Sequence, residues 1–202
     1  MRREDLEQQL AVHVPHAALG YCLDLFDDQP FAFKITPKRS TKLGDYRFDP
    51  RTKSHTVTVN HDLNKYQFLV TYLHEVAHRR VHENNRQQSP HGIIWKKEFQ
   101  RLILPMLRPE VFPEVILRPL ANHMKNPKAS ASVDIKLLSA FQQFDLNRSK
   151  TQLKDLLTDA EFNLRNRSFR KLATKRTRAL CLDLQNQKKY LIPLMAEIEP
   201  KP

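Results

Sequence analysis

Two histidines and a glutamate near the middle of the chain have the spacing of a hydrolytic metal site. His74, Glu75 and His78 form an H-E-x-x-H pattern. On an α-helix, positions i and i+4 lie on the same face one turn apart, so both imidazoles can bind one metal ion. Glu75 lies beside that face, where its carboxylate can contact an activated water without binding the metal. The spacing therefore predicts metal-assisted hydrolysis with Glu75 as the catalytic base.

A catalytic zinc ion takes three protein ligands and leaves a fourth position open for water. We choose His91 as the third ligand, because it lies between a proline and a glycine in a predicted turn and can fold back over the preceding helix. His82 continues the i, i+4, i+8 series, but a helical rise of about 1.5 Å per residue places it about 12 Å along the axis from His74. Glu98, on the following predicted helix, is the other alternative.

The H-E-x-x-H residues belong to a predicted amphipathic helix. Apolar residues with the spacing of a buried helix face are Leu69, Leu73, Val76 and Ala77. Asn60 and Asp62 precede this pattern and are the predicted N-caps. The helix prediction places both histidines one turn apart on a single rigid element.

Three short predicted strands precede the motif helix. Alternating apolar residues predict strands at 31–35, 43–48 and 55–60, separated by short polar turns. Short turns favour an antiparallel sheet, whose exposed edge can accept an extended peptide as an extra strand. Further helices are predicted at 2–12 and 15–27. The predicted fold class is therefore α+β, with a small three-stranded antiparallel sheet beside the motif helix.

A second predicted helix follows the motif helix. Its core spacing starts at Trp95, which we expect to pack under the metal site and hold His91 in place. The proline-rich stretch 109–119 is predicted to be irregular. Small polar residues over 122–134 predict a linker or exposed loop, in which His123 is expected to be a surface residue.

These boundaries predict a metallopeptidase domain at 1–121, the linker at 122–134 and a basic C-terminal region at 135–202. Alternation within the last region predicts a β-hairpin formed by 180–184 and 190–198. The predicted architecture is thus one catalytic domain with a small C-terminal appendage.

The net charge of +12 and the pI near 9.9 favour polyanionic partners, with nucleic acid first among them. Basic residues gather around Phe169, a mixture that can contact phosphates and stack on a base. The predicted nucleic-acid contacts are Arg165, Arg167, Arg170, Lys171, Lys175, Arg176 and Arg178. The alternative interpretation is an exposed and merely solvated strand face.

Cysteine content and hydropathy define the expected environment. Cys22 and Cys181 cannot form a disulfide framework, and Cys22 lies on an apolar helix stripe as a predicted core thiol. No apolar run is long enough for a transmembrane helix, and the first residues lack the apolar core of a signal peptide. We therefore expect a cytoplasmic protein without a membrane partner.

The residues around the predicted metal site resemble the SprT-like zinc metallopeptidases, which include the Spartan proteases. The sequences HEVAH (74–78) and SPHG (89–92), followed by Trp95, carry this resemblance. The third histidine of that family lies in an H-G-x-x-W element, which His91 and the four residues after it match. The similarity is strong over about residues 40–108 and weaker elsewhere.

The resemblance implies a zincin-like core, one catalytic Zn²⁺ and a protein or peptide substrate, with cleavage near DNA, for example of DNA-bound or crosslinked proteins in DNA repair. The chain departs from the family in its C-terminal ribbon, where Cys181 alone cannot form a structural zinc site. Tyr46, Tyr66, Tyr72 and a basic side chain remain equal candidates for stabilising the oxyanion. The alternative function is a non-catalytic nucleic-acid-binding adaptor with a structural or vestigial zinc site, linked to transcription or repair.

Overall fold

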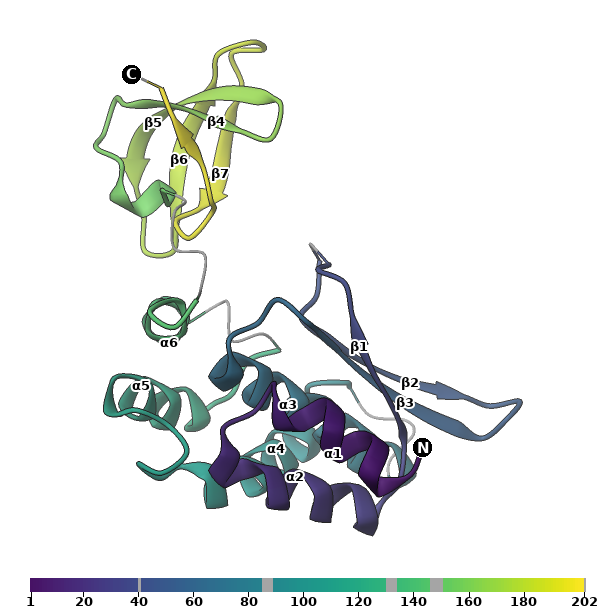
Figure 1. Cartoon of the computed structure of the whole chain (residues 1–202). Coiled ribbons are helices and arrows are strands. Elements are labelled where there is room, and N and C mark those ends of the chain that lie inside the picture. Colours follow the sequence, from purple (N-terminus) through teal and green to yellow (C-terminus); the bar gives the residue numbers. More distant parts are fainter. Residues whose placement is uncertain (40, 85–88, 130–133, 146–150, 202) are drawn as a thin grey trace. The chain divides into compact units, whose positions relative to one another are not determined.

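The chain contains both helices and strands and forms two compact units, Met1–Asp145 and Leu146–Pro202 (Figure 1). The α+β fold class is confirmed. The computed structural model describes residues 1–39, 41–84, 89–129, 134–145 and 151–201. The two units are described separately below.

The two predicted N-terminal helices are present in the first unit, where they pack against one another. They are α1 (Arg3–Ala11) and α2 (His16–Asp28). Each turns an apolar stripe toward the core, and Cys22 on α2 is fully buried there. Burial raises the pKa of this thiol, because a thiolate would lose its hydration. Cys22 is therefore a packing residue, as its position on the stripe predicted.

The three-stranded sheet consists of β1 (Ala32–Thr36), β2 (Gly44–Asp49) and β3 (Ser54–Asn60). The prediction that it is antiparallel is wrong, because β3 lies in the centre, antiparallel to β2 but parallel to β1. β1 and β2 are therefore joined by a crossover past β3 and do not form a hairpin.

Hydrogen bonds hold this crossover at both of its ends. The backbone N–H of His61 donates to Thr36 O at 2.9 Å, and that of Asn60 donates to Leu43 O at 2.8 Å. The Asn60 side chain also accepts from Arg39 at 2.7 Å and donates to Lys42 O at 2.9 Å. The crossover places β1 and β2 on opposite sides of β3, which leaves β2 at an edge of the sheet.

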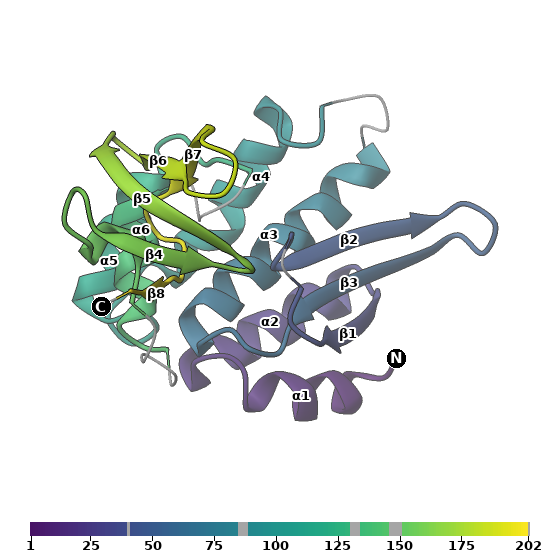
Figure 2. The same cartoon turned by 90° about the horizontal axis from the view of Figure 1, so that it is seen from above.

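The central helix α3 (Lys65–Asn84) lies beside this sheet (Figure 2). Its N-cap is Asn64, not the predicted Asn60 or Asp62, since Asn64 Oδ1 accepts hydrogen bonds from the N–H groups of Tyr66 and Gln67 at 3.2 and 3.0 Å. Asn60 instead ends β3, and its side chain is already hydrogen-bonded to Arg39 and to Lys42 O.

Helix α4 (Ile93–Ile103) follows α3 and ends in a short 3₁₀ turn, Leu104–Met106. Trp95, Phe99, Leu102 and Ile103 form its buried face. Helix α5 (Glu114–Met124) begins within the segment predicted to be irregular, 109–119, and ends within the predicted linker, 122–134, so both predictions are wrong for these residues. Its buried side chains, including Ile116 and Leu120, recur at helical spacing, and this packing outweighs the hydrogen bond lost at the internal Pro119.

Helix α6 (Ile135–Gln142) packs against α5 within the first unit. It is fastened to the start of α3, because Asn64 Nδ2 donates to Phe141 O at 3.0 Å and to Asp145 Oδ1 at 2.6 Å. The sequence had grouped this helix with the C-terminal region. Residues 130–133, within the predicted linker, lie outside the described residues.

The second unit is a five-stranded antiparallel sheet of strand order β7-β6-β5-β4-β8. Its core contains Phe162, Phe169, Cys181 and Ile192. The predicted hairpin corresponds to β6 and β7, but the sequence did not indicate the strands beside it. The elements are the short 3₁₀ helix Leu153–Asp155 and the strands β4 (Glu161–Leu164), β5 (Arg167–Thr174), β6 (Arg178–Asp183), β7 (Lys189–Pro193) and β8 (Glu199–Pro200).

Among the described residues, none of the helices combines the length and the apolar character needed to cross a bilayer.

Candidate metal centre

Three imidazoles converge at the middle of α3. His74 and His78 lie one turn apart on the helix, and His91 reaches them from the turn before α4. The Nε2 atom of His78 lies 3.2 Å from that of His74 and 3.0 Å from that of His91, and the third pair is 3.3 Å apart. The three nitrogens thus form a nearly equilateral triangle.

This triangle fits a metal ion better than it fits hydrogen bonding. An imidazole nitrogen either donates or accepts, so three mutually close nitrogens leave at least one pair with two lone pairs or two N–H groups facing each other. In tetrahedral zinc sites with Zn–N bonds of about 2.0–2.1 Å, the ligand nitrogens lie about 3.3–3.4 Å apart. The observed separations of 3.0–3.3 Å are close to that spacing. Within the described residues, these three side chains form the group whose ligand atoms can share one ion.

Trp95 forms the apolar floor of the centre, as predicted. Its ring centroid lies 4.5 Å from that of His74, 5.2 Å from that of His78 and 4.7 Å from that of His91. Phe99 extends this floor and contacts His74 at 5.4 Å. Because one indole contacts all three imidazoles, the ring orientations are fixed by packing on α4.

Desolvation keeps the three histidines uncharged at neutral pH. Burial lowers the pKa of His78 to about 4 and lowers the pKa values of His74 and His91. The mutual proximity of the rings lowers the values of His74 and His78 further, because two imidazolium ions would repel each other. A neutral imidazole has the free lone pair that a metal requires.

Glu75 is buried beside the histidines, where β2 crosses α3. Burial raises its pKa to about 8, while the backbone N–H of Tyr46 donates to its carboxylate and favours the charged form. The close approach of the strand requires Gly44. A Cβ atom at that position would lie 2.6 Å from Glu75 Oε1 and 2.7 Å from Thr71 Cγ2. The absence of a side chain at Gly44 therefore allows β2 to pack directly against the Glu75 carboxylate.

The centre opens into a cavity of about 580 Å³. One set of lining residues comes from the start of β2, including Gly44, Asp45 and Tyr46, and another from the end of α5 and the segment that follows it. The residues of this second set are His123, Lys128 and Ala129. The cavity thus combines a strand edge, the metal centre and a helical segment.

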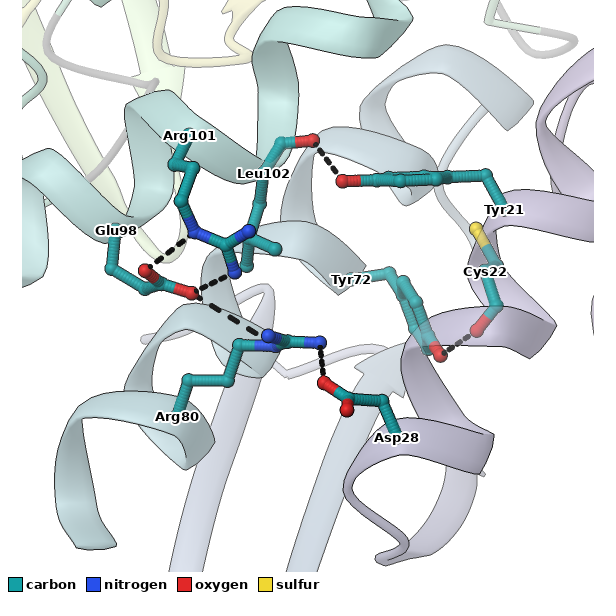
Figure 3. A network of polar contacts seen from close by, with 8 residues as sticks. All are labelled: Tyr21, Cys22, Asp28, Tyr72, Arg80, Glu98, Arg101 and Leu102. Atoms are coloured by element: carbon teal, nitrogen blue, oxygen red, sulfur yellow. Dashed lines mark hydrogen bonds and ion pairs between the residues drawn. The ribbon is translucent and has the colours of Figure 1, made fainter. Parts of the chain in front are cut away.

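The two alternative ligands lie elsewhere. His82 packs among aromatic rings, with its centroid 4.5 Å from Phe48 and 5.7 Å from Tyr46. Glu98 is held by Arg101 at 2.7 Å and lies 3.9 Å from Arg80 (Figure 3). Both side chains are therefore engaged outside the histidine triangle.

Of the three tyrosines considered for oxyanion stabilisation, Tyr46 lines the cavity, and its hydroxyl lies 2.7 Å from His55 Nδ1. The hydroxyl of Tyr72 donates to Cys22 O in the core (Figure 3). The ring of Tyr66 packs against Phe112 and Phe144. Geometry therefore leaves Tyr46 as the tyrosine nearest the chemistry.

The predicted nucleic-acid contacts divide into two groups. Lys171 is removed from the set, because it is buried and its Nζ donates to the carbonyls of Leu153 and Leu156. Arg167 forms an ion pair with the buried Asp183. The remaining residues are exposed on β5, on β6 or in the turns beside them, and they are Arg165, Arg170, Lys175, Arg176 and Arg178.

Sequence analysis missed the role of His123. This residue was expected at the surface, but it is buried and lines the cavity. Its separation from the motif by two helices left no local signal in the sequence.

Comparisons of the chain with protein-family models, with curated proteins and with solved structures found no match.

Proposed function

We propose that this chain is a zinc-dependent peptidase of the SprT-like type. The observation that carries the proposal is the triangle of Nε2 atoms from His74, His78 and His91, with the carboxylate of Glu75 beside it. Structural zinc sites are closed by four protein ligands, whereas three ligands beside a cavity leave a coordination position for water. A zinc ion held here would supply the Lewis acidity that activates water and polarises a peptide carbonyl.

Glu75 would move the proton in this reaction. Its carboxylate takes a proton from the attacking water and returns it to the nitrogen of the leaving amine. Its position supports this assignment, because Glu75 follows His74 directly on α3 and lines the same cavity as the three histidines. Contact with Gly44 and Tyr46 holds the group in position for both transfers.

The edge of β2 is the proposed binding surface for the substrate backbone. In the described part of the chain, β2 pairs with β3 along one side, and its first residues line the cavity. An extended peptide could add to the other side through backbone hydrogen bonds. Such binding would hold the scissile bond across the histidine triangle without requiring a particular side chain.

A location near DNA is a further part of the proposal, supported by charge. The second unit carries 13 Lys and Arg residues against 6 Asp and Glu residues. The exposed members of its basic stretch, among them Arg165 and Arg176, are free to meet phosphates. Substrates bound or crosslinked to DNA would be concentrated near the peptidase by this contact.

The test combines metal analysis with proteolysis. Purified protein should contain about one zinc ion per chain, as expected for a three-histidine catalytic site, and should cleave casein. Glu75→Gln should abolish cleavage while retaining the zinc, because it removes the base and no ligand. Full activity in Glu75→Gln, or a wild-type protein that binds no zinc, would contradict the proposal.

The exposed arginines and lysines of the second unit favour a second candidate, a nucleic-acid-binding adaptor in which the zinc site is structural. Single-stranded DNA distinguishes the two functions. DNA that stimulates cleavage of a DNA-binding protein supports the peptidase, and tight DNA binding with zinc present but no cleavage supports the adaptor.

A further inference from the structure

A fourth histidine, paired with a carboxylate, lines the cavity from the side of α5. His123, near the end of this helix, is 5% exposed and lines the same cavity as His74, His78 and His91. It is close enough for a charge on its ring to affect the pKa of His74. The proposed peptidase mechanism does not use this residue.

Asp134 determines which nitrogen of the His123 ring is an acceptor. Its Oδ2 lies 3.4 Å from Nδ1 of the imidazole, and its Oδ1 accepts from the N–H groups of Lys136 and Leu137 at the start of α6. Burial lowers the pKa of His123, so the ring is neutral at neutral pH. A neutral ring beside a carboxylate carries its proton on Nδ1, which leaves Nε2 as an acceptor.

The segment that carries His123 is tied to the helix beneath the metal centre. Gln100 Nε2 on α4 donates to Met124 O at 2.6 Å, and Lys96 Nζ on the same helix donates to Asn126 Oδ1 at 2.8 Å. Because α4 also positions Trp95 under the three histidines, His123 has a fixed relation to the centre.

An extended peptide on β2 would need such an acceptor. Along a strand, backbone N–H and C=O groups point alternately to the two sides, so half of them face away from β2. β2 and α5 lie on different sides of α3 (Figures 1 and 2), and both the start of β2 and His123 line the cavity. A buried N–H without a partner is costly, which favours an acceptor on the far wall.

We propose that His123 is a substrate-binding residue whose Nε2 accepts a hydrogen bond from a peptide N–H that β2 leaves unpaired. The inference rests on the proposed peptidase function, because it assumes a peptide in the cavity. Asp134 acts as a positioning residue, since it selects the tautomer.

The test measures peptide binding separately from hydrolysis. In a Glu75→Gln background, fluorescein-labelled casein peptides are titrated against zinc-loaded protein and followed by anisotropy. His123→Phe removes the acceptor but retains a ring, and should weaken binding about tenfold. Asp134→Asn keeps an N-cap side chain, yet its amide can donate to Nδ1 and convert Nε2 into a donor, so it should weaken binding to a similar extent.

The control variant is His16→Phe, an exposed histidine at the start of α2, which should bind like the parent protein. In the active background, both test variants should raise KM about tenfold and leave kcat within about twofold. Unchanged peptide binding in His123→Phe and Asp134→Asn would overturn the inference. Loss of zinc in either variant would also overturn it, because His123 would then support the metal ligands instead.

Two further outcomes are separable. If the parent protein neither holds zinc nor cleaves casein, the proposed function fails, while the same titration on metal-free protein still decides whether His123 contributes to peptide binding. If His123→Phe does not fold, which circular dichroism would reveal, the peptide affinity of Asp134→Asn decides in its place. This variant should fold, because asparagine at position 134 can still cap α6.

Discussion

The histidine triangle of the first unit and the basic strands of the second unit are both clusters of chemically capable residues, but they differ in how each side chain is directed. On α3, a spacing of four residues sends His74 and His78 to the same place, whatever the rest of the fold does. On β5, neighbouring residues point to opposite faces, so Arg170 is exposed while Lys171 is buried. Spacing on a helix therefore predicts convergence, whereas a run of charges on a strand does not predict exposure.

Arg167 illustrates the second case. Its guanidinium forms an ion pair with Asp183 and lies 4.7 Å over the ring of Tyr190. These contacts stabilise the sheet through charge and stacking rather than leaving the side chain for a phosphate. The experiments below test this contrast between the histidine triangle, a converging cluster, and the basic residues of 165–178, a cluster divided between exposed and buried side chains.

The largest effect should come from His91→Ala in the converging cluster. Removal of one of three ligands is expected to lower zinc affinity at least about 100-fold, which exceeds the usual loss from an outer partner. Competition with a chromophoric chelator measures this change. His82→Ala is the matched control, because His82 packs among Tyr46, Phe48 and His55 and should leave zinc affinity unchanged. Equal losses in both variants would mean that the ligand assignment is wrong.

Lys171→Met tests the divided cluster. Loss of the ammonium leaves the carbonyls of Leu153 and Leu156 without their donor, and should lower the free energy of unfolding by about 3 kcal/mol. Urea denaturation measures the change. The exposed Lys175→Met should alter stability by less than about 0.5 kcal/mol. A stable Lys171→Met protein with weakened DNA binding would show that this lysine contacts nucleic acid after all.

Gly44→Ala tests whether the close approach of β2 to α3 positions Glu75 in the converging cluster. The added methyl group would meet Glu75 and Thr71 well inside van der Waals distance, so either β2 or the side chains of Glu75 and Thr71 must shift. We expect a loss of about 2 kcal/mol in stability, and slower casein cleavage with zinc retained. Thermal unfolding and zinc content provide the two measurements. Wild-type cleavage in this variant would mean that the position of β2 does not control Glu75.

The smallest effect should come from the exposed basic residues. Lys175→Gln and Arg176→Gln should each weaken binding of a fluorescein-labelled (dT)20 strand about threefold and reduce the salt slope by about one. Anisotropy titrations at several salt concentrations measure both quantities. The control is Lys34→Gln on β1, an exposed lysine outside the basic stretch. An equal loss in this control would indicate dependence on net charge alone.

Local geometry explains how much of the site the sequence revealed. His74, Glu75 and His78 are fixed relative to one another by one helix, so their spacing was sufficient to bring them together. The choice of His91 over His82 and Glu98 depended on its place between a proline and a glycine. His123 was missed because its approach depends on how α5 packs, which no local pattern encodes.

The same distinction holds for the fold. Helices α1 to α4 followed from apolar periodicity, and the β2–β3 hairpin followed from its short turn. The parallel pairing of β1 with β3 depends on how the chain passes from β1 to the far side of β3, which periodicity does not specify. Likewise, α5 forms despite Pro119 because tertiary burial outweighs the local preference of proline.

An open strand edge that recruits substrate backbones can also recruit the same edge of another copy, which is a route to aggregation. In β2, the positions that alternate with Tyr46 and Phe48 are Asp45, Arg47 and Asp49, so every second residue carries a charge. Charged side chains along an edge disfavour stacking of identical strands, while a flexible peptide can adapt to them. The charge pattern of β2 thus protects the chain from self-association at the place where it is most accessible.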